Sequence, residues 1–210
     1  ATPVEMEFAI NVDKGSENRK FAILQVRQLM DESVDIDIDL EEVDREKAVC
    51  ISSKSLGNGV IDEIRDVVYV NPEHMNRMRT ADLVPLIEEI DADLRNRGRP
   101  YLLIGPGRWG TSDPSLGIPV QWNQLMGAKA IVEAQMTDIH VDPSQGTHFF
   151  QNIVTFNIGY LTIAEGDLVD WHWLDSHPSK FDNHGLRHIS LEEPLKVVLD
   201  SRDSEAIVVR

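Results

Sequence analysis

The feature that most constrains this chain is a pair of alternating segments close to its start. From Val4 to Ile10, apolar side chains alternate with Glu5 and Glu7, so both carboxylates share one face of a strand. Turn-forming residues follow at 13–18, and a second strand is predicted from Lys20 to Met30, which makes an antiparallel hairpin. Because an isolated hairpin is marginally stable in water, we expect the rest of its sheet to lie upstream in a longer polypeptide.

The polar face of this predicted hairpin has the residue types of a metal and phosphate site. Glu5 and Glu7 are two residues apart on one strand, and Gln25 and Arg27 are two residues apart on the other. Carboxylates are ligands for Mg²⁺, and an arginine with an amide can contact the phosphates that the ion bridges. A solvated polar face on an amphipathic hairpin is the alternative interpretation of the same pattern.

Beyond the hairpin, the pattern predicts a mixed α+β fold with few helices. Residues 31–44 are acidic and predict a linker or an exposed edge strand, so we divide the chain into residues 1–45 and 46–210. The second part contains several short apolar segments that predict strands, the last of which would close the sheet. They are 48–53, 67–71, 101–104, 130–134, 160–164, 188–191, 195–199 and 207–209.

One segment predicts a long helix, from Thr80 to Arg97. Thr80 is placed to cap it, Pro85 stands near its start, and Gly98 and Pro100 follow its end. Four apolar residues recur at helical spacing, which predicts that this helix packs one stripe against the sheet. They are Leu83, Ile87, Ile90 and Leu94.

The charge of the chain argues against two classes of partner. With 20 basic and 36 acidic residues the formal net charge is −16, and such a surface repels nucleic-acid backbones and anionic membranes. No apolar run approaches the roughly 20 residues that a membrane-spanning helix needs. Cys50 is the only cysteine, so an internal disulfide is excluded and a reducing, cytoplasmic location is expected.

Two parts of the sequence are similar to one enzyme family. Val4–Ile10 followed by Phe21–Arg27 resembles the closing hairpin of the ATP-grasp domain of phosphoenolpyruvate synthase and pyruvate phosphate dikinase. This chain has Gln28 where the family has proline, and its connecting turn is longer. Residues 103–110 and 143–152 resemble the C-terminal region of a phosphoenolpyruvate synthase-like subgroup.

The resemblance implies roles for the hairpin residues. Glu5 and Glu7 would serve the metal–nucleotide site through Mg²⁺, and Gln25 and Arg27 match the Gln-x-Arg motif that contacts the phosphates of ATP. The partners of the chain would then be the upstream domains of the same polypeptide. The expected activity is transfer of a phosphoryl group from Mg-ATP to a carrier or small acceptor by the whole enzyme, and the chain alone is expected to be inactive.

A glycine-rich turn follows the predicted strand at 101–104. Gly105–Gly110 spells G-x-G-x-x-G, but the prolines and glycine within 114–119 forbid the helix that a dinucleotide site needs there. We therefore expect a rigid turn that projects Arg108 and Trp109. The alternative is packing, with Trp109 in the core or an interface and Arg108 in a surface ion pair.

A predicted helix at 147–155 would complete a second candidate site beside this turn. Its apolar face is formed by Phe149, Phe150, Ile153 and Val154, and its polar face by His148, Gln151, Asn152 and Thr155. A helix start and a rigidly held arginine both attract anions, so a site for a small anion is expected. Its residues would be Arg108, His148, Gln151 and Asn152. Two alternatives stay open for His148, which are a structural histidine and an echo of the phosphocarrier histidine loop of the resembled family.

The remaining histidines and tryptophans favour packing over chemistry. Five of the seven histidines follow residue 145, but their spacing is not typical of a zinc site and no cysteine joins them. Trp171 and Trp173 alternate on a strand or lie on a short helix capped by Asp167.

A competing hypothesis treats residues 46–210 as a non-catalytic module for ligand binding or assembly, including assembly into a homo-oligomer. An exposed apolar patch containing Trp109, Trp122 or Trp171 would favour assembly.

Overall fold

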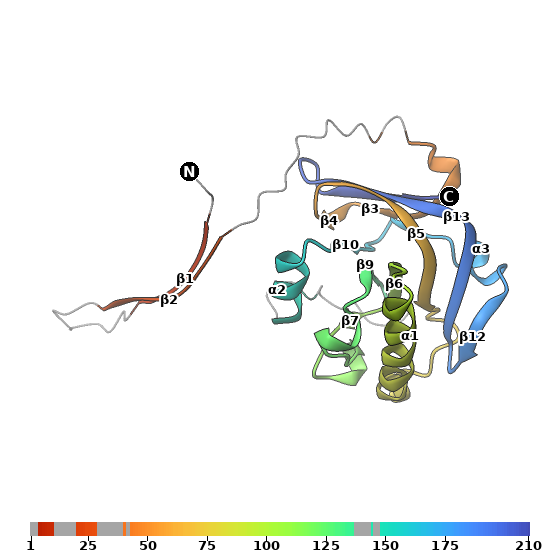
Figure 1. Ribbon diagram of the computed structural model, residues 1–210, viewed down its shortest axis with the longest axis horizontal. Coiled ribbons are helices and arrows are strands. Elements are labelled where there is room, and N and C mark those ends of the chain that lie inside the picture. Colours follow the sequence, from red (N-terminus) through yellow and green to blue (C-terminus); the bar gives the residue numbers. More distant parts are fainter. Residues whose placement is uncertain (1–3, 11–19, 29–39, 41–42, 137–143, 145–147) are drawn as a thin grey trace. The chain divides into compact units, whose positions relative to one another are not determined.

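The structure, a computed structural model, describes residues 4–10, 20–28, 40, 43–136, 144 and 148–210, and for residues 4, 5, 27, 28 and 77 it describes the backbone alone. The chain divides into two compact units, Ala1–Ile36 and Asp37–Arg210. Each unit has its own main sheet (Figure 1).

The sheet of the first unit is an antiparallel hairpin of β1 (Val4–Ile10) and β2 (Phe21–Gln28), as the sequence predicts. The register shifts between Glu7 and Phe8, which pair with Gln25 and Ile23, so Leu24 is an extra residue on β2. Such a bulge increases the local twist and re-aims the neighbouring side chains. The predicted end of the second strand at Met30 lies outside the described residues.

The second unit is built on one mixed sheet of ten strands. Across the sheet the order is β11-β3-β14-β13-β5-β6-β9-β10-β4, and β12 pairs with β13 outside this path. The bounds are β3 Ala48–Ser52, β4 Lys54–Leu56, β5 Gly59–Val70, β6 Tyr101–Pro106, β9 Ala128–Ala134, β10 Gly159–Thr162, β11 Leu168–Val169, β12 Ser179–Asn183, β13 Leu186–Asp200 and β14 Glu205–Val209. A separate two-stranded sheet pairs β7 (Arg108–Trp109) with β8 (Gly117–Ile118).

One short connection links the two ends of the strand order. β3 and β4 are separated by Ser53 alone, yet β3 pairs with β14 and β11, whereas β4 pairs with β10. Side chains also link the β3–β4 connection to the end of β10 and the residues before β11. Ser52 Oγ donates to the carbonyl of Thr162 at 2.8 Å, and Ser53 N donates to Asp167 Oδ1 at 3.1 Å. The β3–β4 connection therefore brings the two ends of the strand order close to each other.

Three α-helices and four short 3-10 helices accompany the sheet in the described part of the chain. They are α1 (Val84–Asn96), α2 (His148–Thr155), α3 (Trp171–Asp175), η2 (Arg45–Lys47), η3 (Arg77–Leu83), η4 (Pro114–Leu116) and η5 (Trp122–Gln124). The predicted class, mixed α+β with few helices, is confirmed. None of the described helices has the length and apolar composition to cross a membrane.

Two buried clusters account for most of the core. One lies between the helices and the sheet, where Ile87 and Leu94 of α1 and Ile153 of α2 pack with Val68 and Leu103. The other takes side chains from β3, β5, β6, β9, β10, β13 and β14, together with α3. Figure 1 shows α1 lying along the parallel part of the sheet formed by β5, β6, β9 and β10.

The long predicted helix exists, but its start is different. The four stripe residues Leu83, Ile87, Ile90 and Leu94 are buried, and Gly98 has the left-handed φ of +63° typical of a helix end. Thr80 is not the cap: it lies within η3, and its hydroxyl donates to the carbonyl of Pro114 at 2.9 Å. Pro85 places the start of α1 at Val84, because proline is accommodated in the first turn of an α-helix.

Other boundaries also differ from the sequence pattern. The strands predicted at 188–191 and 195–199 are one long strand, β13, with register shifts between Ser190 and Leu195 that accommodate Pro194. β5 begins at Gly59, well before the predicted 67–71. Trp171 and Trp173 lie on the short helix α3, but its cap is Asp170, whose carboxylate accepts from Trp173 N at 2.9 Å.

Candidate functional site

The hairpin brings the four predicted metal and phosphate residues into two opposed pairs. In the backbone register Glu5 is opposite Arg27, and Glu7 is opposite Gln25. Directly opposed residues on an antiparallel pair have neighbouring side chains, so the backbone places an acidic residue across from each of the two phosphate-type residues. The side chains of Glu7 and Gln25 are exposed, whereas those of Glu5 and Arg27 are outside the described part of the chain.

The apolar face of the hairpin is also open. Phe8 and Phe21 pack against each other with ring centroids 5.2 Å apart, but they remain 53% and 57% exposed. Met6, Ile23 and Val26 are between 44% and 53% exposed. Exposed apolar side chains in a row are typical of a strand surface that meets another element.

The glycine-rich turn leads into a strand and not into a helix, as the sequence predicts. β6 ends at Pro106 and β7 begins at Arg108. Trp109 is only 1% exposed, and its indole nitrogen donates to the carbonyl of Val132 at 3.2 Å. Its ring covers Gly105, where an added Cβ would lie 2.4 Å from the nearest ring atom. Trp109 is therefore a core residue, and the packing interpretation holds for it.

A buried carboxylate lies directly beneath this turn. Glu133, near the end of β9, is 5% exposed and accepts hydrogen bonds from the backbone N–H groups of Trp109 and Ser144, both at 3.0 Å. The hydroxyl of Tyr160 donates to the same carboxylate at 2.5 Å, and the hydroxyl of Ser144 makes a further short hydrogen bond to it. Glu133 thus ties together β7, β9, β10 and the segment before α2.

The electrostatics of this cluster are dominated by burial. Burial raises the pKa of Glu133, and the hydrogen bonds from Ser144, Tyr160 and Trp109 offset only part of that increase. Burial and the neighbouring Glu133 carboxylate raise the pKa of Tyr160, while the positive charge of Arg108 lowers it. Arg108 therefore lies within electrostatic range of the cluster.

The predicted helix at 147–155 is confirmed as α2, and residue 147 lies outside the described residues. Phe149 and Ile153 are buried, but Val154 is 40% exposed, so the predicted apolar face is narrower than its four residues. On the polar face, His148 Nδ1 lies 3.4 Å from Gln151 Oε1. Asn152 Nδ2 donates to the backbone carbonyl of His148 at 3.0 Å.

The turn and the start of α2 meet where Gly110 packs against the side chain of Phe149. A Cβ added at Gly110 would lie 2.5 Å from the ring of Phe149, the residue after His148. Arg108 itself is half-buried, and His148 and Gln151 are exposed. A joint anion site of Arg108, His148, Gln151 and Asn152 stays a prediction that this proximity makes sterically reasonable.

Sequence reasoning did not single out Glu133, Ser144 or Tyr160. Each is an isolated polar residue. Glu133 and Tyr160 come together because β9 and β10 are parallel neighbours, and Ser144 reaches them from the segment before α2. The available signal was Glu133 itself, an acidic residue at the end of an otherwise apolar strand.

Within the described ranges, no three His, Cys, Asp or Glu side chains are grouped to hold a metal ion. Comparison with protein families, with characterised proteins and with solved structures finds no match to this chain.

Proposed function

We propose that the hairpin β1–β2 is one wall of a Mg-ATP site in an ATP-dependent phosphotransferase, with phosphoryl transfer to a carrier or a small acceptor. The observation that supports this most directly is the register, which sets Glu5 against Arg27 and Glu7 against Gln25. The resemblance to the closing hairpin of the phosphoenolpyruvate synthase and pyruvate phosphate dikinase ATP-grasp domain motivates the choice of nucleotide.

The chemistry of the four residues suits this role. Mg²⁺ is a hard cation that binds one or two carboxylates together with phosphate oxygens. Glu5 and Glu7 provide the two carboxylates, and the remaining coordination positions are left for the phosphates. Arg27 presents a planar guanidinium that matches two phosphate oxygens, and Gln25 adds an amide donor. Because these groups occupy one face of a two-stranded hairpin, they contact a nucleotide from one side only.

The proposal predicts weak, Mg-dependent binding of ATP to the chain itself. In a nuclear magnetic resonance titration, the amide signals of Glu7 and Gln25 should shift and saturate, with a dissociation constant on the order of millimolar. Arg27→Ala should weaken binding about tenfold because a charge-assisted hydrogen bond is lost. Glu7→Gln should abolish the difference between Mg-ATP and ATP alone.

Matched controls lie in the second unit, where Arg45 and Glu46 are exposed. Arg45→Ala and Glu46→Gln change the net charge in the same way and should leave the titration unaltered. Shifts that are equal in all four variants would show that the polar side of the hairpin is a solvated surface and not a nucleotide site. Micromolar binding would contradict the one-wall geometry, since it would require a complete site.

A second candidate, assembly through residues 46–210, is favoured by one specific observation. Phe156 is 52% exposed and stacks on Trp122, with ring centroids 5.4 Å apart and an angle of 8° between the planes. The indole nitrogen of Trp122 is buried and has no hydrogen-bond partner among the described residues. An exposed aromatic stack of this kind is typical of protein contact surfaces, and it contains one of the three tryptophans named above.

A further inference from the structure

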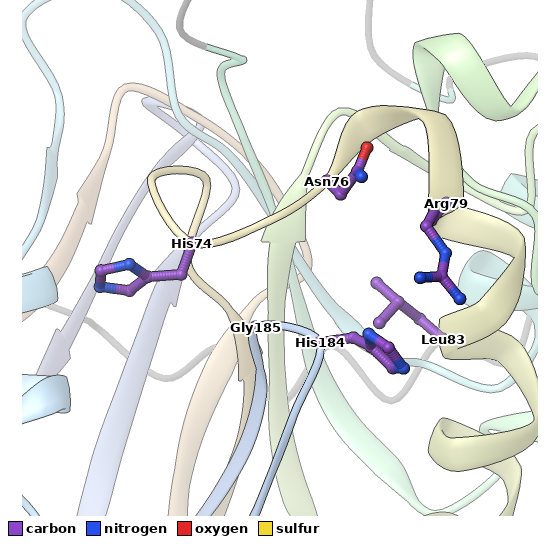
Figure 2. A pocket seen from close by; sticks show the side chains of 6 residues that line it. All are labelled: His74, Asn76, Arg79, Leu83, His184 and Gly185. Atoms are coloured by element: carbon purple, nitrogen blue, oxygen red, sulfur yellow. The ribbon is translucent and has the colours of Figure 1, made fainter.

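A small polar pocket lies between the start of η3 and the turn that joins β12 to β13. It has a volume of about 170 Å³ and is lined by His74, Asn76, Arg79, Leu83, His184 and Gly185. Figure 2 shows the guanidinium of Arg79 and the imidazole of His184 converging beside Leu83, while the ring of His74 points away from them. Since a water molecule takes about 30 Å³ in the liquid, the pocket accommodates a group of a few heavy atoms.

His184 is held in an unfavourable backbone conformation at the wall of this pocket. His184 and Gly185 have φ values of +53° and +83°, and they form the two-residue connection between Asn183 and Leu186. Two consecutive positive φ values define a type I′ hairpin turn, for which Asn-Gly is the preferred sequence. A non-glycine residue in this region costs on the order of 1 kcal/mol or more, and such positions concentrate at ligand sites.

The second position of this turn is fixed by packing. A Cβ added at Gly185 would lie 2.8 Å from the backbone carbonyl oxygen of His74. Glycine is therefore required there, whereas nothing in the packing requires an imidazole at His184. Asparagine adopts this turn conformation more readily than histidine does, so the imidazole ring is expected to have a role other than forming the turn.

The guanidinium of Arg79 is held in one direction by an ion pair. Its Nε donates to Asp82 Oδ2 at 2.6 Å, which fixes the direction of the side chain. Among the described residues the guanidinium has that one ion pair, and its terminal N–H groups face the pocket (Figure 2). Within the described ranges the imidazole of His184 makes no hydrogen bond, and it carries at least one N–H donor in either protonation state.

We infer that this pocket binds the oxyanion group of a small ligand, a phosphate or a carboxylate, through Arg79 and His184. A guanidinium whose Nε is already engaged presents a pair of terminal N–H donors to two oxygens of one group. In a chain with a formal net charge of −16, a pocket that is lined by an arginine and a histidine and by no acidic residue of the described part of the chain marks a local site for an anion, although Asp82 holds the Nε of the arginine. The buried side chain of Leu83 supplies an apolar floor for the rest of the ligand. This site is independent of the proposed nucleotide wall.

The test is a nuclear magnetic resonance titration with inorganic phosphate and, separately, with acetate, at constant ionic strength set by potassium chloride. The amide of Gly185 and the Nε–H of Arg79 should shift and saturate in the millimolar range. Saturation by phosphate alone identifies a phosphate ligand, and saturation by acetate identifies a carboxylate ligand. If neither anion produces saturation, the inference is wrong.

Two variants separate a binding role from a structural one. His184→Asn keeps the type I′ turn, so the protein should be equally or more stable to urea, but its affinity should fall about fivefold because the imidazole N–H is replaced by a shorter side chain. Arg79→Gln should weaken binding about tenfold, whereas Arg97→Gln, which removes an equally exposed arginine paired with Asp93, should not change it. Unchanged affinity in His184→Asn, or equal losses in both arginine variants, would overturn the assignment.

Discussion

At the scale of single residues, Glu133 is an almost fully buried carboxylate that is surrounded by hydrogen-bond donors. It accepts hydrogen bonds from Trp109, Ser144 and Tyr160, which belong to three different segments. A carboxylate has several acceptor sites and suits a position surrounded by donors, which explains why a charged residue is buried near the end of β9. Its burial nevertheless penalises the ionised form, so its pKa is raised.

We predict that Glu133→Gln lowers the free energy of unfolding by about 2 kcal/mol at pH 5. The amide has one acceptor oxygen and one donor nitrogen, so one of the two backbone N–H groups, of Trp109 or Ser144, would face another donor. Urea unfolding monitored by tryptophan fluorescence measures this loss. Glu89→Gln, an exposed position on α1, is the control and should be neutral within about 0.5 kcal/mol.

The free energy of unfolding of the unmodified protein and that of Glu133→Gln should depend differently on pH. The pKa of Glu133 is raised in the folded state above its usual 4.5, so its contribution to stability is present below that value and is lost as the pH rises through the folded-state pKa. The pKa values of Asp66, Asp175 and Asp200 are lowered from 3.8, so their contributions are complete by about pH 5. The destabilisation caused by Glu133→Gln should therefore be smaller at pH 8 than at pH 5. A constant difference would show that Glu133 does not titrate in this range.

At the scale of elements, the turn between β6 and β8 is shaped by glycines that the neighbouring backbone contacts. Gly107 has a φ of +68°, and an added Cβ would lie 2.3 Å from the carbonyl oxygen of Leu116. Gly98, at the end of α1, has almost the same φ, +63°, but open space around it. The two glycines share the conformational requirement and differ only in packing.

Comparing alanine substitutions at Gly98 and Gly107 isolates the effect of packing, because the backbone strain is the same at both positions. Gly98→Ala should cost about 1 kcal/mol of unfolding free energy, the usual penalty for alanine at positive φ. Gly107→Ala carries the same strain and must also push η4 away from the turn, so it should cost more than about 3 kcal/mol. Thermal unfolding of the two variants measures the difference. Equal losses would mean that the turn moves freely away from η4.

The elements that could be predicted from the sequence are those with a strong local pattern. The stripe from Leu83 to Leu94 and the alternation in Val4–Ile10 specify their periods directly, and both were correct. Short or polar strands such as β4 and β12 give no such signal. β13 was divided in two because Pro194 ordinarily ends a strand, and only a register shift allows it inside.

At the scale of the whole second unit, the order of strands could not be predicted. β14 lies between β3 and β13, and β10 beside β4, through pairings between residues far apart in the sequence. Alternation specifies which side of a strand is apolar, but it does not specify the neighbouring strand or its direction. For the same reason the joint site of Arg108 and His148 stays a prediction, while the cluster around Glu133 and the pocket of Arg79 and His184 emerged only from the fold.

The charge of the chain and its exposed aromatic stack have opposite effects on self-association. A net charge of −16 makes like molecules repel, and this repulsion weakens once salt shortens the screening length to a few ångströms. The stack of Phe156 on Trp122 offers apolar area whose burial is not weakened by salt. If residues 46–210 act in assembly, association should therefore increase with ionic strength.

We predict that the chain is more strongly self-associated at about 0.5 M than at about 0.02 M potassium chloride, as sedimentation velocity would show. Phe156→Ser should remove this association, because it deletes the most exposed ring of the stack. Met78→Ser is the matched control, since Met78 is 88% exposed and lies on η3, outside the stack. Equal behaviour of the two variants, or a monomer at both salt concentrations, would exclude this surface as an assembly contact and leave the aromatic stack a packing feature of α2 and η5.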